Sequence, residues 1–240
     1  MNKLQKKFTK EIEEVVYVCH RLHKLQYVSS HGGNLSFNID NNHFLITPTK
    51  VPKGNIEFDD ILIINLDGEV LFAGNDRKPT GEAFMYLRFF KKRPDLRGLI
   101  HAHPPILTGF ALSDDKILER PLLPETIIEV GPILPVKYTK PVSLELAKAF
   151  DEVIDKSNAF LMKNHGVMIG NSLGPGRALE LLEMIELQAH SVLVARMLGK
   201  VIEIPELEIL NLQKVLESRN LTIPGNPLKI KSLSQLFFNK

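Results

Sequence analysis

The sequence has little of several features that define particular protein classes. Its 240 residues include one cysteine, Cys19, so no internal disulfide can form and a reducing cytoplasm is the expected location. Thirty basic and 28 acidic residues leave a net charge of +2, which gives no electrostatic basis for binding nucleic acid. Apolar runs such as 61–64 are far shorter than the roughly 20 residues that cross a membrane. The charged first ten residues lack the apolar segment of a signal peptide.

The composition that remains is that of a globular protein. Hydrophobic residues make up 44% and charged residues 24% of the chain, and no internal repeat or low-complexity tract occurs. A chain of this length buries roughly 70% of its unfolded surface, so it needs no disulfide or other crosslink. We expect one domain over residues 1–200. The tail, residues 201–240, is expected to pack on the same domain or on a neighbouring subunit.

Hydrophobic periodicity predicts helices and strands in alternation. Apolar residues at steps of three and four predict helices over 4–25, from Pro79-Thr80 to Pro94, and over 178–198. The second helix has a predicted apolar side of Phe84, Leu87 and Phe90, and Lys91-Lys92-Arg93 is interpreted as its basic end. Alternating or apolar runs predict strands over 34–39, 43–47, 61–65, 69–72, 96–103, 159–162 and 167–169. This alternation indicates an α/β fold, and the two hairpins indicate a sheet that is partly antiparallel.

The most informative local pattern is His101-Ala102-His103 at the end of a predicted buried strand. Side chains at i and i+2 of a strand point to the same face, so the two imidazoles lie side by side. Neutral imidazole is a good ligand for zinc and similar ions. Two surface histidines in a proline-rich turn are the alternative interpretation of this pattern.

Two further residues extend this pattern. His165 also lies where a buried strand stops, beside Gly166, which allows close approach of another backbone. A catalytic zinc takes three protein ligands and an open or displaceable fourth position, so a carboxylate should complete the set. Glu82 is the candidate, in the first turn of the predicted helix, where free N–H groups favour an anion.

Small and hydroxyl residues gather at two other strand ends. Gly32-Gly33-Asn34 precedes one strand, and Thr47-Pro48-Thr49-Lys50 follows another. Hydroxyls and backbone amides at such positions can surround a phosphate, although glycine and threonine also serve turn geometry alone.

Together these motifs resemble the class II aldolase/adducin family, the group of L-fuculose-phosphate aldolase and L-ribulose-5-phosphate 4-epimerase. The resemblance covers roughly residues 8–200. It rests on five segments in the family's order: Gly33-Asn34-Leu35-Ser36, Ile46-Thr47-Pro48-Thr49, Lys78-Pro79-Thr80-Gly81-Glu82, His101-Ala102-His103-Pro104 and Asn164-His165-Gly166.

The resemblance implies a three-layer α/β/α subunit with a mixed, largely antiparallel central sheet. It also implies a homotetramer with active sites at subunit interfaces. Zn²⁺, or another divalent metal, would be held by Glu82, His101, His103 and His165, and Glu82 would also move protons. The expected activity is that of a lyase in carbohydrate metabolism, which cleaves a phosphorylated ketose or related aldol through a zinc-stabilised enediolate. The residues expected to bind the sugar phosphate are Gly33, Asn34, Thr49, Lys50, Thr80 and Gly81.

Several departures from the family pattern bear on the chemistry. Lys50 stands where the family often has glycine, and it adds a positive charge beside the predicted phosphate site. The fuculose-phosphate aldolases use two tyrosines, but the loop position falls near Thr126 here and no tyrosine follows Tyr138. Glu125 is a candidate substitute for the missing proton donor, and a solvated loop charge is the other interpretation.

Other functions remain open at this point. The epimerase branch typically carries aspartate where this chain has Glu82, which favours a lyase over an epimerase. Dehydratases and decarboxylases use a similar enediolate. A non-catalytic interaction module, as in adducin, would have no reason to keep the four ligands together, and an unrelated zinc hydrolase is compatible with His-x-His alone. Residues 113–125 and the tail carry no motif that identifies the substrate.

Overall fold

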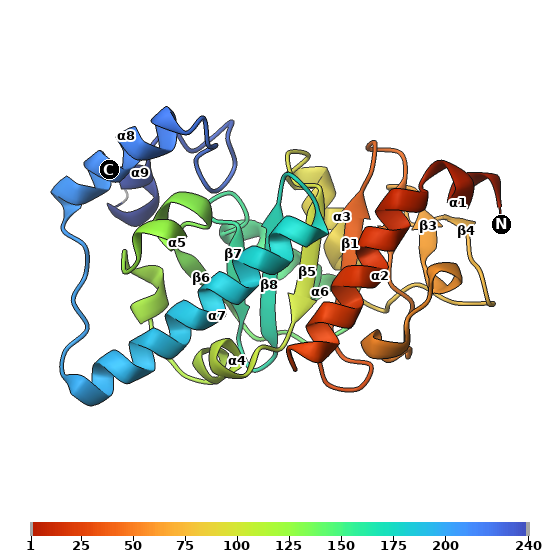
Figure 1. Cartoon of the computed structure of the whole chain (residues 1–240), viewed down its shortest axis with the longest axis horizontal. Helices are drawn as coiled ribbons and strands as arrows, with labels where there is room; N and C mark the ends of the chain where they lie inside the picture. The colour runs from red at the N-terminus through yellow and green to blue at the C-terminus, as the bar shows by residue number, and fades with distance from the viewer. Residues whose placement is uncertain (1, 239–240) are drawn as a thin grey trace.

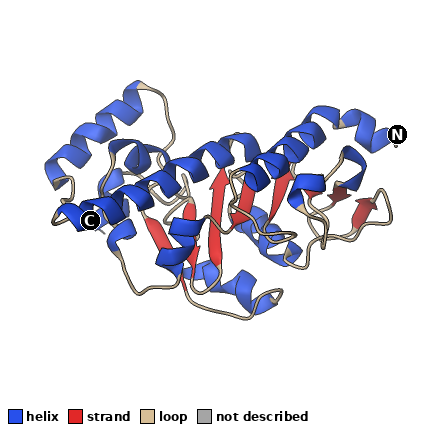
Figure 2. Cartoon of the chain, turned by 60° about the horizontal axis from the view of Figure 1, so that its bottom comes forward, coloured by secondary structure: helices blue, strands red, loops and turns tan. Residues whose placement is uncertain are grey.

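One mixed β-sheet forms the middle of this computed structural model, which describes residues 2–238. Figures 1 and 2 show its strands side by side, with helices on both faces. The strand order is β4-β3-β2-β1-β5-β8-β7-β6, and every neighbouring pair is antiparallel except β6 with β7. The strands are β1 (Asn34–Asn38), β2 (Phe44–Ile46), β3 (Leu62–Ile64), β4 (Val70–Phe72), β5 (Gly98–Ala102), β6 (Ile133–Val136), β7 (Ala159–Met162) and β8 (Gly166–Asn171).

Helices cover the sheet on both faces, so the predicted three-layer α/β/α arrangement with a largely antiparallel sheet is confirmed. Two apolar clusters fill the space, one between the sheet and α2, α4 and α7, the other between the sheet and α3 and α6. In Figure 1, α2 and α7 cross the front of the sheet and α3 and α6 lie behind it. The helices are α1 (Lys3–Lys7), α2 (Thr9–Lys24), α3 (Ala83–Lys92), α4 (Pro105–Ala111), α5 (Pro124–Glu129), α6 (Leu144–Ala149), α7 (Pro175–Leu198), α8 (Glu206–Ser218) and α9 (Leu233–Phe238), with short 3₁₀ turns η1 (Lys53–Asn55), η2 (Phe58–Asp60), η3 (Ile117–Glu119) and η4 (Phe150–Glu152).

Side-chain alternation along β5 decides which layer faces the histidines. Ile100 and Ala102 belong to the cluster beneath α7, whereas Leu99 belongs to the cluster beneath α3. His101 is two residues after Leu99 and therefore points toward the α3 layer. The start of α3 carries Glu82, so the sheet geometry directs His101 and Glu82 toward each other.

Three predictions about helices need correction. The predicted first helix is two helices, because Phe8 leaves helical geometry with φ −114° and ψ 30°. The second helix begins at Ala83, later than Pro79-Thr80, and Phe84 is 56% exposed. A hydrophobic pattern predicts which residues share one face of a helix, but it does not show which of them another element covers. Lys91 and Lys92 lie in the last turn of α3 and Arg93 is its C-cap, so the basic helix end is confirmed, although the Arg93 side chain is fully buried.

Periodicity missed the elements between residues 104 and 136. Prolines interrupt this stretch, beginning with Pro104-Pro105 and continuing to Pro132 and Pro135. Nevertheless α4 and α5 begin at Pro105 and Pro124, where the absent proline N–H would be unpaired in any case. Strand β6 accommodates Pro135 because it lies at the edge of the sheet.

The tail folds back onto the rest of the chain. Helices α8 and α9 pack with α5 around an apolar cluster of their own, formed by Ile127, Ile128, Ile209, Leu216 and Leu233. The guanidinium of Arg93 also donates to the carbonyl oxygen of Gly225 at 2.8 Å. Across residues 2–238, helices with the length and apolarity to cross a bilayer are absent.

Candidate metal centre

The site forms at one end of the central strands because their neighbours run antiparallel to β5. The carboxyl end of β5 lies beside the first residue of β1, with Asn34 paired to His101. On the other side, Ala102 pairs with Val167 of β8, and His165 lies in the turn just before that strand. An antiparallel register therefore brings together residues that are 131 positions apart, from Asn34 to His165.

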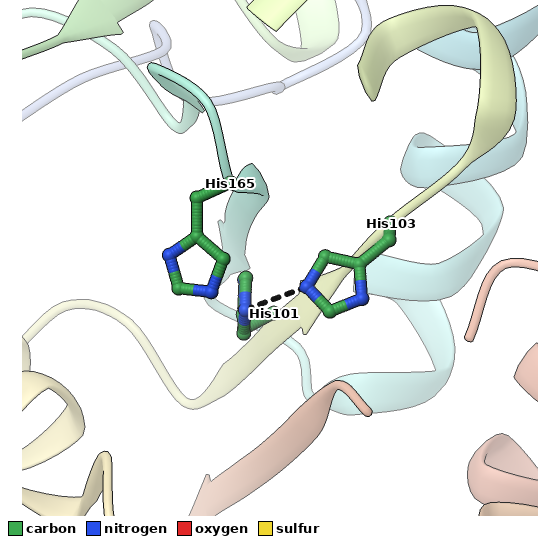
Figure 3. Close-up of side chains that lie close together, drawn as sticks. All are labelled: His101, His103 and His165. Carbon is green, nitrogen blue, oxygen red and sulfur yellow. Dashed lines mark hydrogen bonds between the residues drawn. The ribbon is translucent and has the colours of Figure 1, made fainter. Parts of the chain in front are cut away.

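Three imidazoles meet at this place. One nitrogen of each ring of His101, His103 and His165 lies within 4.8 Å of the others. Figure 3 shows the rings turned toward one another, with the Nε2 atoms of His101 and His103 3.1 Å apart. Glu82 faces the same point: its Oε2 lies 3.6 Å from His101 Nε2 and its Oε1 3.7 Å from His165 Nε2. The three imidazoles thus form one cluster, and the Glu82 carboxylate lies beside two of them.

The environment keeps the histidines neutral. Burial and the His165 imidazole lower the pKa of His101 to about 3. Burial and the other two imidazoles lower the pKa of His103 to about 3 as well, and burial lowers the pKa of His165. The Nδ1–H of His101 donates to the carbonyl oxygen of Val167 at 2.9 Å, so the lone pair of Nε2 faces the other rings. A neutral imidazole with its partner nitrogen hydrogen-bonded is the form that binds metals.

Two glycines, which lack a Cβ atom, allow the backbone to pack closely around the histidines. A Cβ on Gly166 would lie 2.4 Å from His103 Cδ2 and 2.5 Å from the carbonyl oxygen of Ala102. Gly33 has φ +65°, and a Cβ there would lie 2.9 Å from the carbonyl oxygen of His101. The expected close approach at Gly166 is therefore present, and larger residues at either position would displace the strand end that carries His101 and His103.

A hydrogen bond from the first residue of β1 holds the Glu82 carboxylate. It precedes α3 as its N-cap residue, just outside the predicted first turn, and it is 7% exposed. Its Oε2 accepts a hydrogen bond from Nδ2 of Asn34 at 2.9 Å. The phenol of Tyr86 donates to Asn34 in turn. Burial and the Glu82 carboxylate raise the pKa of Tyr86 well above its ordinary value, so this phenol keeps its proton.

The segments predicted to bind phosphate are joined to each other beside Glu82. The backbone N–H of Thr49 donates to the carbonyl oxygen of Lys78 at 2.9 Å, and that of Thr80 donates to the carbonyl oxygen of Thr47 at 3.0 Å. The Thr80 hydroxyl lies 3.4 Å from the backbone nitrogen of Glu82. The structure thus places Thr49 and Thr80 on paired loops next to the carboxylate.

The remaining predicted residues lie nearer the surface. Lys50 is exposed, with φ +60°, directly after Thr49. Gly81 is exposed too, and a Cβ there would lie 2.6 Å from Val142 Cγ1. Glu125 is exposed on the first turn of α5, and within residues 2–238 no hydrogen bond or ion pair joins it to the histidines.

The sequence analysis did not single out Tyr86 and Lys53, two residues with buried polar groups. Tyr86 lies four residues after Glu82, a spacing that places both on one side of a helix and could have drawn attention to it. Lys53 is 1% exposed, and its Nζ donates to the carbonyl oxygen of Val51 at 3.2 Å. Nothing in the local sequence distinguishes Lys53 from a solvated lysine.

The fold and the histidine cluster define an α/β protein with a candidate site for a divalent metal. The chain belongs to the class II aldolase and adducin N-terminal domain family, whose model matches residues 13–193.

Relatives of known activity include aldolases and decarboxylases. The chain is 32% identical to 5-deoxy-D-ribulose 1-phosphate aldolase of Bacillus thuringiensis over 212 residues, 87% of this chain and 96% of that protein. It is 33% identical to L-fuculose phosphate aldolase of Methanococcus maripaludis over 64% of this chain and 80% of that protein. It is 29% identical to 3-oxo-tetronate 4-phosphate decarboxylase of Haemophilus influenzae over 67% of this chain and 76% of that protein.

Solved structures support the fold independently. The structure of a putative aldolase/epimerase/decarboxylase from Klebsiella pneumoniae matches with a TM-score of 0.78 at 24% identity. The match covers 85% of this chain and 98% of the other. At this identity the likeness shows that the two chains share the fold.

Proposed function

We propose that this protein is a zinc-dependent lyase that cleaves a ketose 1-phosphate by a retro-aldol reaction. The observation that supports the proposal is the cluster of His101, His103 and His165, with the Glu82 carboxylate 3.6 and 3.7 Å from two of the imidazoles. The similarity to two aldolases of phosphorylated ketoses supports the reaction class.

The four side chains fit a divalent cation. Three neutral imidazole nitrogens and one carboxylate form a donor set that zinc accepts. Without an ion, Nε2 of His103 donates its proton to Nε2 of His101 at 3.1 Å, and a cation would take the place of this proton. His101, His103 and His165 would hold the ion, and Glu82 would be its fourth, displaceable ligand. A bound zinc ion would polarise the substrate carbonyl and stabilise negative charge that develops on its oxygen.

The reaction needs one proton to leave and one to arrive. When the C3–C4 bond of a ketose 1-phosphate breaks, its electron pair passes to C3 and the C2 carbonyl, and C4 becomes an aldehyde. The C4 hydroxyl loses its proton and C3 gains one, which yields dihydroxyacetone phosphate. Glu82, which is buried beside the imidazoles, would transfer the C3 proton. For the C4 side, Glu125 remains the predicted proton-transfer group.

The phosphate would bind on the paired loops next to Glu82. Asn34, Thr49 and Thr80 offer amide and hydroxyl donors there, with the backbone of Gly33 and Gly81 beside them, and Lys50 adds a positive charge at the exposed rim. Binding the phosphate end away from the reacting carbons would orient the substrate against the histidines.

The test is a direct assay of aldol cleavage. The protein loaded with Zn²⁺ is incubated with L-fuculose 1-phosphate and with 5-deoxy-D-ribulose 1-phosphate, and dihydroxyacetone phosphate and aldehyde are measured. We expect release of both products from at least one substrate, and loss of release after chelation.

Glu82→Gln should keep the fold and lose at least about 100-fold in turnover, since its proton transfer contributes about 10²–10⁴-fold. Glu13→Gln, on the exposed side of α2, is the matched control. Cleavage by the Glu82→Gln protein at the normal rate would refute the role of Glu82.

Decarboxylation is the second candidate, because a decarboxylase of a phosphorylated sugar acid is among the similar proteins. Loss of CO₂ from 3-oxo-tetronate 4-phosphate also leaves a carbanion next to a carbonyl, so the same side chains would serve. Release of CO₂ without cleavage of either ketose phosphate would replace the aldolase proposal with this one.

The state of the protein in the cell belongs to the same proposal. We propose a cytoplasmic homotetramer with sites at subunit interfaces, in keeping with the family resemblance and with the single buried thiol. Sedimentation of the native protein tests the assembly. The non-catalytic alternative is disfavoured, because an interaction module gains nothing from buried histidines that are neutral and face one another.

A further inference from the structure

Tyr86 has an unusual place for a core residue. Its side chain is fully buried, and its ring belongs to the apolar cluster beneath α3. The hydroxyl lies 2.7 Å from Oδ1 of Asn34 and 2.6 Å from the main-chain carbonyl oxygen of the same residue. A phenol has one proton to donate, so the two acceptors share it. Packing accounts for the ring, whereas the hydroxyl is directed at Asn34.

This contact fixes the orientation of the Asn34 amide. An ionised carboxylate only accepts hydrogen bonds, so the group that faces Glu82 must be Nδ2. The phenol donates, so the group that faces Tyr86 must be Oδ1. The two contacts at 2.9 Å and 2.7 Å agree on a single orientation. Removal of the Tyr86 hydroxyl would leave the buried Oδ1 of Asn34 without this hydrogen-bond donor.

The amide in turn fixes the carboxylate. Asn34 binds Oε2 of Glu82, which leaves Oε1 facing His165 at 3.7 Å. Glu82 makes no side-chain hydrogen bond as the cap of α3. The rotation of its carboxylate therefore depends on Asn34, and the orientation of Asn34 depends on Tyr86.

We propose that Tyr86 is a positioning residue that acts through Asn34 to hold Glu82 in the orientation needed for metal binding and proton transfer. The inference rests on the proposed function of Glu82. It assigns to a buried hydroxyl a role that packing does not require.

The primary variant is Tyr86→Phe, which removes the hydroxyl and keeps the ring. Outer partners of metal ligands typically contribute about 10–100-fold, so we expect kcat to fall about 10-fold with KM within about 2-fold. The dissociation constant for Zn²⁺, measured by competition with a chromophoric chelator, should rise about 10-fold without any substrate present. Tyr17→Phe is the matched control, because Tyr17 is 59% exposed and lies on α2.

A double-mutant cycle separates positioning from general loosening of the core. If Tyr86 acts through Asn34, adding Tyr86→Phe to Asn34→Ala should change the Zn²⁺ dissociation constant and kcat by less than about 2-fold. Effects that multiply in the double variant would overturn the proposal. Asn34→Ala alone gives a second readout: unchanged Zn²⁺ affinity would mean that Tyr86 has nothing to act through.

Two outcomes separate a failure of the proposed function from a failure of the role of Tyr86. Turnover by Glu82→Gln at the normal rate would refute the proposed function itself. Loss of turnover in Glu82→Gln together with a Tyr86→Phe protein that matches the unsubstituted chain would overturn only the role of Tyr86.

Discussion

Two buried polar clusters in this protein differ in how completely their hydrogen bonds are made. Arg93 is fully buried, and its guanidinium donates to Asp95, Asn158 and the carbonyl oxygens of Ile154, Ser157 and Gly225.

The histidine cluster is the opposite case. Nε2 of His165 and Oε1 of Glu82 face each other 3.7 Å apart, and Oε2 of Glu82 stands 3.6 Å from Nε2 of His101, so neither pair is within hydrogen-bond distance. Buried polar groups are normally paired, since an unpaired one costs about 1–3 kcal/mol. A satisfied cluster such as that of Arg93 holds elements together. An incompletely paired one is available to a ligand, which is why we assign function to the second.

The largest expected effect is on the satisfied cluster. Arg93→Met leaves six buried or half-buried acceptor atoms without their donor, and removal of one partner from a buried ionic network costs about 3–5 kcal/mol. Urea unfolding of the metal-free protein should show this loss, while Zn²⁺ affinity of the folded protein stays the same. Arg93→Lys keeps the charge but loses the planar donor geometry. Its free energy of unfolding should lie between those of the unsubstituted protein and of Arg93→Met. Weakened Zn²⁺ binding in Arg93→Met would show that the clusters are not independent.

The converse substitution is His101→Ala. We expect the Zn²⁺ affinity to fall at least about 100-fold, because direct ligands contribute more than the outer partners that cost 10–100-fold. The free energy of unfolding of the metal-free protein should change less than in Arg93→Met. His190→Ala, exposed on α7, is the control. Equal Zn²⁺ affinities of the His101→Ala and His190→Ala proteins would place the metal elsewhere.

The pH dependence of stability sharpens the contrast further. His101 and His103 have folded pKa values of about 3, below the ordinary 6.5, so the unfolded chain binds more protons between these values. Stability of the metal-free protein should therefore fall as pH is lowered through 6.5 toward 3. From pH 7 to 5.5 the loss is about 1 kcal/mol for each histidine.

Urea unfolding in the presence of a chelator at the two pH values measures this loss. The double variant His101→Asn/His103→Asn should show a smaller difference between pH 7 and pH 5.5. The same difference in both proteins would mean that these histidines are not held neutral by burial.

Substitution of Glu186 should have the smallest effect on the free energy of unfolding. This buried carboxylate is intermediate between the Arg93 and histidine clusters. It is 8% exposed on α7, and its two oxygens accept hydrogen bonds from the backbone nitrogens of Ile106 and Leu107, each at 2.8 Å. These are free N–H groups in the first turn of α4, which begins at Pro105, two residues after His103. Glu186→Gln replaces one acceptor with a donor and should cost about 1 kcal/mol of unfolding free energy.

Glu183→Gln, on the same helix, is its control. Glu183 pairs with Arg21 at 3.3 Å, and both side chains are about one-third exposed. Exposed ion pairs contribute little, so the free energy of unfolding should fall less than in Glu186→Gln. Equal losses in the two variants would refute the inference that Glu186 anchors α4.

The candidate site was predictable to an uneven extent. His101, His103, His165, Glu82 and Asn34 each belong to a short motif, and the structure brings them together as the motifs indicate. Tyr86 was not predicted, because its hydroxyl bonds to a residue 52 positions away. The burial of Arg93 was not predicted for the same reason, because segments far along the chain cover it.

The order of helices and strands and the chemical type of the donor groups follow from the sequence by itself. Local periodicity and side-chain chemistry act over a few residues, and both are visible along the chain. The antiparallel register of β1, β5 and β8 decided which groups meet, and the covering layers decided which are buried and neutral. Those outcomes depend on contacts between distant segments, whose energies no local pattern records.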